Sequence, residues 1–229
     1  MTKTLSKPTG QKRVFIVDDH PLFREGLAGL VKRESDLAIC GEADNAAHAL
    51  SAIEQLKPEV VLADIGLPGR SGLELIKDIL AVCPDAAVLV ISMHDEALYA
   101  ERVLRAGGRG YIMKQEGADK ILQSIRLVSS GQVSVSAKMS VRLLDAFSGR
   151  QAKHKSPISR LTDRELEIFQ LIGRGEDSHT IARQLNLSVK TVDTHRGHVK
   201  EKLELKSGTE LIAYAARWVA TQPVAEPDR

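Results

Sequence analysis

Apolar residues follow two different patterns along the first half of the chain. Short runs of consecutive aliphatic residues, typical of strands covered by helices on both faces, alternate with segments whose apolar residues recur every third or fourth position, as in amphipathic helices. The runs predict strands at residues 13–17, 37–43, 60–63, 87–92 and 110–114. The other segments predict helices after Pro21 and at 46–56, 72–82, 96–106 and 119–129.

Strands and helices that alternate in this way predict an α/β domain with a doubly wound parallel sheet. A short helix is expected at 137–146, and from Leu161 onward the pattern is helical throughout. Residues 148–160 combine Gly, Pro and Ser with basic residues and no acid, which is typical of a flexible linker. The predicted organisation is a tail at 1–12, an α/β domain at 13–131, a linker with a short helix at 132–160, an all-α domain at 161–221 and a tail at 222–229.

The C-terminal domain has the pattern of a helix-turn-helix. Thr162 and Glu165 form a capping-box sequence at the start of its first helix. A short helix at 178–185 and a longer one at 189–203 follow, joined by a tight turn, with Ser188 as the expected N-cap of the longer helix. Two helices in this arrangement, the second of them basic, are typical of DNA-binding domains.

Charge is distributed unevenly between the two domains. The chain has 229 residues and a formal net charge of +2. Residues 1–149 hold 18 Lys and Arg against 19 Asp and Glu, whereas residues 150–229 hold 14 against 11. The basic surplus favours a polyanion as the partner of the C-terminal domain.

Cysteine usage and hydropathy indicate a cytoplasmic protein. Cys40 and Cys83 have no metal-ligand spacing, as expected in a reducing compartment. The polar N-terminal segment lacks the apolar core of a signal peptide, and no apolar run approaches the roughly 20 residues that span a bilayer. We therefore expect no membrane partner.

Four of the predicted strands end in polar residues with related chemistry: Asp18 and Asp19, Asp64, Ser92, and Lys114. The carboxyl ends of parallel strands meet at one edge of the sheet, where such folds bind ligands. Clustered carboxylates repel one another unless a cation lies among them, and their oxygens suit Mg²⁺. Beside Mg²⁺ and a lysine, an Asp carboxylate can attack a phosphoryl group and form an aspartyl phosphate.

Two other interpretations of Asp64 are open. An Asp directly after a strand can simply cap the turn that Gly66, Pro68 and Gly69 form. A Mg²⁺-dependent phosphohydrolase would also use an aspartyl nucleophile. Such an enzyme needs a second carboxylate two residues later as its acid and base, and Gly66 stands there instead. The sequence therefore argues against the enzyme.

Residues 12–131 resemble the receiver domain of bacterial response regulators, notably in Asp18, Asp19, Asp64, Pro68, Gly72, Ser92, Tyr111 and Lys114. The resemblance implies a flavodoxin-like sheet of order 2-1-3-4-5 and phosphotransfer from a sensor histidine kinase to Asp64. It also implies Mg²⁺ held directly by Asp19, Asp64 and the carbonyl of Gly66, with Asp18 acting through water.

The same resemblance assigns a switch to three further residues. Ser92 is expected to move to meet the phosphoryl group and Tyr111 to rotate inward behind it, while Lys114 reaches a phosphoryl oxygen. An ordinary half-buried aromatic residue at a strand edge is the other interpretation of Tyr111. Leu67 stands where Met is commoner in the family, a change of similar volume that we expect to matter little.

The longer helix of the C-terminal domain has distinct inner and outer faces. At 100° per residue, Val192, Val199 and Leu203 share one direction and are expected to face the core. The residues that point away are Lys190, Thr194, Gly197, His198 and Glu201, with Asp193 at one flank. A solvated polar face is the other interpretation of this pattern. The turn, the basic surplus and the attached phosphoryl-acceptor domain favour DNA.

Residues 161–218 are similar to the LuxR-type helix-turn-helix, notably in Leu161-Thr162, Arg164-Glu165, Ile181-Ala182, Leu185, Lys190-Thr191-Val192 and His195. The combination with a receiver resembles the NarL/FixJ family. By that resemblance Asp193, Thr194 and Gly197 face base edges of double-stranded DNA. Phosphates would be held by Lys190, Thr191, Arg196 and Lys200.

Two departures from the LuxR-type pattern bear on DNA contact. The acidic stretch 176–179 replaces a neutral or basic loop, which weakens any phosphate contact there. Gly197 lies in the middle of a helix at a cost of about 1 kcal/mol, and close approach of its backbone to DNA explains it best. His195, at the inner edge of the helix, is expected to be structural.

The chain is therefore interpreted as a response regulator that controls transcription, and whose only reactions are its own phosphorylation and slow dephosphorylation. A receiver-based interaction switch without DNA output is the remaining alternative. We expect the unphosphorylated receiver to cover part of the helix at 189–203, and phosphorylation to release it for dimerisation. The last helix begins with a capping-box sequence at 207–210. Its apolar residues Leu211, Ala215 and Trp218 either form a twofold contact or pack within their own domain.

Overall fold

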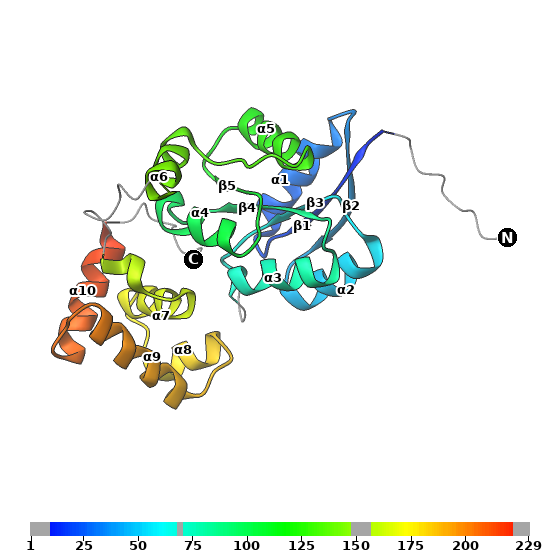
Figure 1. Ribbon diagram of the computed structural model, residues 1–229. Coiled ribbons are helices and arrows are strands. Elements are labelled where there is room, and N and C mark those ends of the chain that lie inside the picture. The colour runs from blue at the N-terminus through cyan, green and yellow to red at the C-terminus, as the bar shows by residue number, and fades with distance from the viewer. Residues whose placement is uncertain (1–9, 68–70, 148–156, 222–229) are drawn as a thin grey trace.

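The computed structural model describes residues 10–67, 71–147 and 157–221 (Figure 1). The N-terminal domain contains β1 (Lys12–Val17), α1 (Pro21–Lys32), β2 (Leu37–Ala43), α2 (Ala46–Leu56), β3 (Val60–Ala63), α3 (Gly72–Val82), β4 (Ala87–Ser92), α4 (Glu96–Arg105), β5 (Gly110–Met113) and α5 (Ala118–Ser129). It is followed by α6 (Ala137–Phe147) and a short 3-10 helix (Pro157–Arg160). The C-terminal domain contains α7 (Asp163–Gly173), α8 (Ser178–Gln184), α9 (Val189–Lys202) and α10 (Gly208–Ala220).

The N-terminal domain is built on a parallel sheet with the strand order β2-β1-β3-β4-β5. Helices α1 and α5 cover one face of the sheet, and α2, α3 and α4 cover the other (Figure 1). The prediction of a flavodoxin-like, doubly wound α/β domain followed by an all-α domain is confirmed.

Alternate residues of the central strands enter two different cores. Phe15 and Val61 pack with α2 and α3, whereas Val14, Ile16 and Leu62 pack with α1 and α5. All five side chains are at most 1% exposed. Because both faces are covered, these strands carry uninterrupted apolar runs, which is why the sequence pattern revealed them.

The predicted helices and strands agree with the structure to within a residue or two at their ends. Leu22 is an exception to the expected apolar stripe of α1, since it is 85% exposed. At 100° per residue it points about 180° away from the buried Val31. The predictions for residues 1–9, for Pro68 and Gly69, for residues 148–156 of the linker and for the C-terminal tail lie outside the described residues. The prediction that the flexible linker extends to residue 160 is wrong, because Pro157–Arg160 forms a 3-10 helix whose Ile158 is fully buried.

The C-terminal domain has the local interactions that its sequence predicts. Thr162 and Glu165 form a complete capping box, and the hydroxyl of Ser188 caps α9 by accepting from the backbone N–H of Thr191. Val192 and Val199 are fully buried. The inner and outer faces of α9 are therefore those that the angular analysis predicts.

Of the two interpretations of Leu211, Ala215 and Trp218, packing within their own domain is the one that the structure supports. Leu211 and Ala215 are fully buried where α10 packs on α7, and the Trp218 ring lies 5.4 Å from the ring of Phe169. The stripe on α10 is needed to close the core of its own domain. Leu211 and Ala215 are therefore occupied within the domain, whereas Trp218 is partly exposed.

The two domains contact each other through α4 and α7. Both Nη atoms of Arg102 donate across the contact, to Oδ1 of Asp163 at 2.6 Å and to the carbonyl of Leu161 at 2.7 Å. The Tyr99 hydroxyl donates to Oε1 of Gln170 at 2.8 Å. A cavity of about 260 Å³ is lined by residues of α3, α4, α7 and α8.

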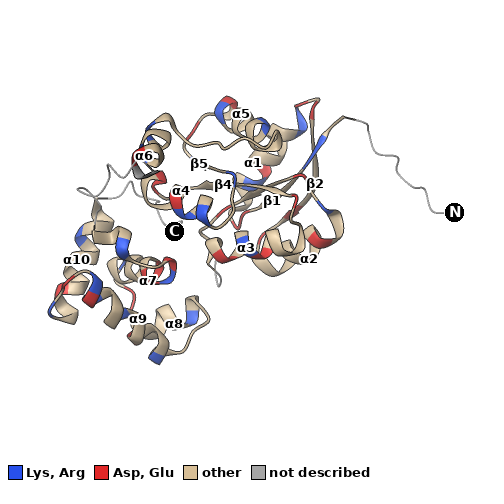
Figure 2. Cartoon of the chain, viewed as in Figure 1, with Lys and Arg blue, Asp and Glu red and all other residues tan. Residues whose placement is uncertain are grey.

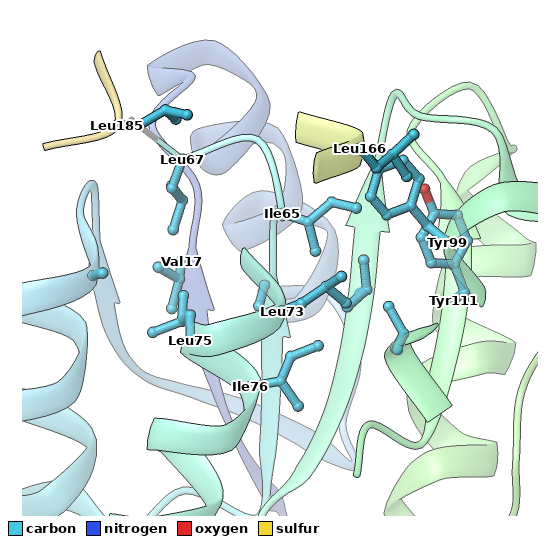
Figure 3. Close-up of a cluster of buried hydrophobic side chains, with 14 of the residues drawn as sticks. Val17, Ile65, Leu67, Leu73, Leu75, Ile76, Tyr99, Tyr111, Leu166 and Leu185 are labelled. Atoms are coloured by element: carbon cyan, nitrogen blue, oxygen red, sulfur yellow. The ribbon is translucent and has the colours of Figure 1, made fainter. Parts of the chain in front are cut away.

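Apolar side chains complete this contact and join the cores of the two domains. Figure 3 shows Leu185, at the end of α8, next to Leu67, and Leu166 near Ile65. The prediction that the receiver covers part of the helix at 189–203 is wrong, because α7 is the helix that lies against α4. Lys190, on the outer face of α9, is exposed to solvent.

No helix in the described part of the chain is both long and apolar enough to cross a membrane.

Candidate functional site

The strand ends bring three of the predicted site residues into direct contact. Lys114 Nζ lies 2.8 Å from Oδ2 of Asp18 and 2.7 Å from Oδ2 of Asp64. Each of these side chains is at most 4% exposed. They follow β1, β3 and β5, whose carboxyl ends meet at one edge of the sheet. A buried ion cluster therefore lies at the predicted position.

The charge of Lys114 is maintained by its carboxylate neighbours. Burial disfavours the charged amine, but the attraction of Asp64 and the hydrogen bonds to Asp18 and Asp64 outweigh burial and raise the pKa of Lys114. The amine also lies 4.6 Å from the ring centroid of Phe23. Lys114 is thus a fixed positive charge directly against the carboxylate of Asp64.

Asp19 completes the acidic set and is the most accessible of the three carboxylates. Burial raises the pKa of Asp19, and repulsion from Asp64 and Asp18 adds to the increase, while His20 opposes it. Its Oδ1 atom is buried and lies 2.9 Å from Nδ1 of His20. Three carboxylates that repel one another at one edge of the sheet fit a divalent cation with oxygen ligands such as Mg²⁺.

His20 is a member of this cluster that the sequence analysis did not assign. Its Nδ1 atom lies 3.1 Å from Oδ1 of Asp18, 2.9 Å from Oδ1 of Asp19 and 3.8 Å from Oδ2 of Asp64. The signal in the sequence was its position directly after the acidic pair. The direction of its side chain, however, depends on how the chain turns into α1.

Two glycines allow the backbone to approach the carboxylate of Asp64. The N–H of Gly66 donates to Oδ1 of Asp64 at 2.9 Å, which places the Gly66 backbone over the site. A Cβ on Gly72 would lie 2.2 Å from the Cα atom of Ile65. Position 72 therefore requires glycine if α3 is to start against the loop that follows Asp64.

Ser92 and Tyr111, the two other predicted switch residues, both hydrogen-bond to the backbone of His94. Ser92 is fully buried at the end of β4, and its Oγ accepts from the N–H of His94 at 3.3 Å. The Tyr111 hydroxyl donates to the carbonyl of His94 at 2.7 Å. Tyr111 is 2% exposed, so its ring already has the inward position that we expected only after phosphorylation. The alternative of a half-buried edge residue is excluded.

His94 links this site to the domain contact, a role that the sequence did not reveal. Its ring centroid lies 5.0 Å from that of Tyr99, which donates to Gln170 of the C-terminal domain. Burial lowers the pKa of His94, with Asp64 opposing the change. His94 is therefore a neutral ring between the strand ends and α7.

The predicted DNA-facing residues lie on the outer face of α9. Lys190, Asp193, Thr194 and His198 are exposed, and Thr191, Arg196, Gly197 and Lys200 are partly exposed. Figure 2 shows basic positions on α8 and α9. The residues predicted to contact DNA are therefore accessible to solvent and include the basic side chains Lys190, Arg196 and Lys200.

Three of these residues have partners within the domain. Ser178 donates to Oδ1 of Asp193 at 2.8 Å, and Nη1 of Arg196 donates to the Ser178 hydroxyl at 3.0 Å. The Thr194 hydroxyl donates to the carbonyl of Lys190 at 2.9 Å. The hydroxyl of the exposed Thr194 is therefore already paired within the helix.

Comparison with known families divides the chain in the same way as the structure. Residues 14–126 match the response regulator receiver domain, and residues 159–215 match the luxR family of bacterial regulatory proteins. Oxygen regulatory protein NreC of Staphylococcus carnosus is 34% identical over 210 residues, which are 90% of this chain and 97% of NreC.

Solved structures of response regulators share the fold. RcsB from Salmonella enterica serovar Typhimurium, bound to promoter rprA in the presence of the phosphomimetic BeF3-, matches with a TM-score of 0.66 and 22% identity over 90% of this chain and 99% of that one. A LuxR-family response regulator from Aurantimonas matches with a TM-score of 0.56 and 28% identity over 61% of this chain and 99% of that one.

The receiver, the LuxR-type domain and the similarity to NreC over nearly the whole chain lead to one assignment. The chain belongs to the NarL/FixJ family of response regulators, which are transcription regulators with a receiver and a DNA-binding domain.

Proposed function

We propose that Asp64 accepts a phosphoryl group from a sensor histidine kinase and that this modification controls DNA binding by α9. The observation that carries the proposal is the contact of Lys114 with both Asp18 and Asp64, with Asp19 beside them, at the carboxyl edge of the sheet. An oxygen of Asp64 forms the new bond to phosphorus while the bond between phosphorus and the nitrogen of the kinase histidine breaks.

Asp18, Asp19, Asp64 and the carbonyl of Gly66 are the residues that we propose hold Mg²⁺ during this reaction. The clustered carboxylates and the repulsion of Asp19 by Asp64 and Asp18 support such a site. Bound Mg²⁺ supplies positive charge that offsets the charge of the phosphoryl oxygens. Lys114 supplies a second positive charge from the protein, and Ser92 supplies a hydroxyl donor to a phosphoryl oxygen.

The same site accounts for self-phosphorylation from a small phosphodonor and for slow dephosphorylation. Position 66, where a phosphohydrolase carries its acid and base, is glycine. The N–H of Gly66 instead donates to the acceptor carboxylate. Water at the aspartyl phosphate is therefore not activated by a second carboxylate at that position, and the modification lasts long enough to act as a signal.

We further propose that phosphorylated chains bind paired half-sites as homodimers. Asp193, Thr194 and Gly197 face the bases, His198 lies on the same outer face, and Lys190, Thr191, Arg196 and Lys200 hold phosphates. The fold shared with RcsB, which is bound to a promoter in its structure, supports this mode of binding. Leu211 and Ala215 are buried inside their own domain, so we do not propose them for the dimer surface.

The contact between α4 and α7 provides a route from the site to the DNA-binding domain. Ser92 accepts from the backbone of His94, the His94 ring lies against Tyr99, and Tyr99 donates to Gln170. If Ser92 moves toward a phosphoryl oxygen, its hydrogen bond to His94 is lost and the position of Tyr99 changes. We propose that this change weakens the domain contact and shifts the chain to an open state.

The assignment of Asp64 can be tested with a radiolabelled acyl phosphate and Mg²⁺. We expect acid-stable, base-labile label on the parent chain and none on Asp64→Asn, since the amide keeps the shape and loses the nucleophile. Asp85→Asn is the matched control, because Asp85 is an exposed carboxylate at the opposite edge of the sheet. Equal labelling of Asp64→Asn and the parent would show that another residue is the acceptor.

A further inference from the structure

A second cluster of metal-ligating side chains lies in the C-terminal domain. It consists of Glu165 on α7 and of His195 and His198 on α9, and one potential ligand atom from each lies within 4.8 Å of the other two. The two histidines are three residues apart, so they project from one face of the helix. Their ring centroids are 6.3 Å apart.

Glu165 is an anionic, buried carboxylate whose two oxygens have different surroundings. Oε2 accepts from the backbone N–H of Thr162 at 2.7 Å and from Nζ of Lys202 at 2.6 Å, whereas Oε1 lies 3.8 Å from Nδ1 of His198. Burial opposes ionisation, but the hydrogen bonds from Lys202 and Thr162 outweigh it and lower the pKa of Glu165. The capping box thus uses Oε2 of Glu165, and Oε1 is left facing His198.

His195 has a buried nitrogen atom whose lack of a hydrogen bond is not explained by the packing of the helix-turn-helix. Its Nδ1 is buried and has no hydrogen-bond partner among the described residues. Buried polar atoms are nearly always paired in native proteins, so such an atom needs a reason. Burial lowers the pKa of His195, with Glu165 opposing, and the neutral ring that results has a lone pair available to a metal.

We propose that Glu165, His195 and His198 form a binding site for a divalent late-transition-metal cation such as Zn²⁺. Two imidazole nitrogens and one carboxylate oxygen are ligands of this class of metal, whereas Mg²⁺ prefers oxygen ligands alone. His198 is 53% exposed, which gives the cation a path from solvent and leaves a fourth position for water.

Binding requires only a modest convergence of the three side chains. Bonds of about 2.1 Å to a tetrahedral metal place ligand atoms roughly 3.4 Å apart, so the exposed ring of His198 has to turn toward Glu165. A bound cation would join the start of α7 to the middle of α9. It would also withdraw His198 from the surface that faces DNA, which gives this family member a means to sense metal.

The site can be tested by calorimetric titration of Zn²⁺ into the full-length chain. Saturating Mg²⁺ is kept present so that the oxygen-rich cluster of the receiver is occupied. We expect one Zn²⁺ to bind the parent and the affinity to fall at least about tenfold in His198→Gln, which loses a ligand. His179→Gln, an exposed histidine of α8 outside the cluster, is the matched control and should bind as the parent does.

Two further measurements make the result decisive. Zn²⁺ should raise the melting temperature of the parent and not that of His198→Gln, whose fold is checked without metal by circular dichroism. His20→Gln, which alters the receiver cluster, should retain the Zn²⁺ site. The proposal is overturned if His198→Gln binds Zn²⁺ as tightly as the parent, or if His20→Gln abolishes Zn²⁺ binding.

Discussion

Lys114 balances the charges of the acceptor site. It contacts two carboxylates, is 4% exposed, and lies beside the ring of Phe23. A buried charge is tolerated only when it is paired, and here one cation serves two buried anions. A phosphoryl group on Asp64 would add negative charge within reach of the same amine, so Lys114 is placed to sense the modification.

Lys114→Ala should therefore leave phosphorylation of the chain possible but prevent the dimerisation that follows it. We expect the variant still to accept phosphate from a small phosphodonor, measured by a mobility shift in a phosphate-affinity gel, but not to dimerise, measured by light scattering. Its free energy of unfolding without Mg²⁺ should fall by about 3–5 kcal/mol, since two buried carboxylates lose their partner.

Lys120→Ala is the control for Lys114→Ala, because Lys120 pairs with Glu116 at the surface of the same domain. An exposed pair contributes about 0–1 kcal/mol, so this variant should behave as the parent does. Normal phosphorylation-dependent dimerisation of Lys114→Ala would contradict the role assigned to Lys114.

The members of the acceptor site were predictable from the sequence where a strand ends directly at them. Asp18, Asp64 and Lys114 belong to this group, because parallel strands place their carboxyl ends at one edge. His20 and His94 were missed, since each lies in a loop and the direction of its side chain depends on tertiary packing. The inward position of Tyr111 was also not predictable without the hydrogen bond to the His94 carbonyl.

At the scale of single elements, α9 combines a buried stripe with an outer face that the protein leaves open. Gly197 lies on that face, and a Cβ added there would meet no atom within 4 Å. Packing within the chain therefore does not require glycine at this position. Because glycine weakens a helix, a partner outside the chain is the better reason for its presence.

Gly197→Ala should make the domain more stable and its DNA binding weaker. We expect the free energy of unfolding, measured in urea, to rise by about 0.5–1 kcal/mol. Affinity for a selected duplex, measured by fluorescence anisotropy, should fall because the added methyl group keeps the backbone from the bases.

Gly26→Ala is the control for Gly197→Ala, since Gly26 lies inside α1 and its added Cβ would likewise meet no atom within 4 Å. It should gain similar stability and bind DNA as the parent does. Unchanged or tighter DNA binding by Gly197→Ala would contradict close approach of the helix backbone.

Helix boundaries were predictable because a cap depends only on neighbouring residues. The partner that packs against the apolar face of a helix was not predictable. The capping box at Thr162 and the Ser188 cap were both readable from neighbouring residues. Helical spacing places Leu211, Ala215 and Trp218 on one face of α10. The spacing alone does not identify the element that covers this face. In the structure α7 covers it.

At the scale of the whole molecule, the contact between α4 and α7 holds the two domains in a closed arrangement. Arg102 makes two hydrogen bonds across this contact, and Tyr99 makes a third. Contacts between domains in one chain depend on side chains far apart in sequence, which is why the sequence analysis placed the contact on α9 and not on α7. Phosphorylation needs to supply only a few kcal/mol to reverse such an equilibrium.

The most direct test is the affinity of the full-length chain for a duplex selected from a random DNA pool, measured at one salt concentration with and without an acyl phosphate. The parent should bind more tightly with the phosphodonor. Arg102→Ala should bind more tightly than the parent without it, by about 10–150-fold, since hydrogen bonds of a charged group contribute about 1.5–3 kcal/mol.

Arg105→Ala is the control in this titration, because Arg105 lies on the same helix and pairs with Glu101 within it. It should need the phosphodonor as the parent does. The account is contradicted if the phosphodonor leaves the affinity of the parent unchanged, or if Arg102→Ala without phosphodonor binds no more tightly than the parent.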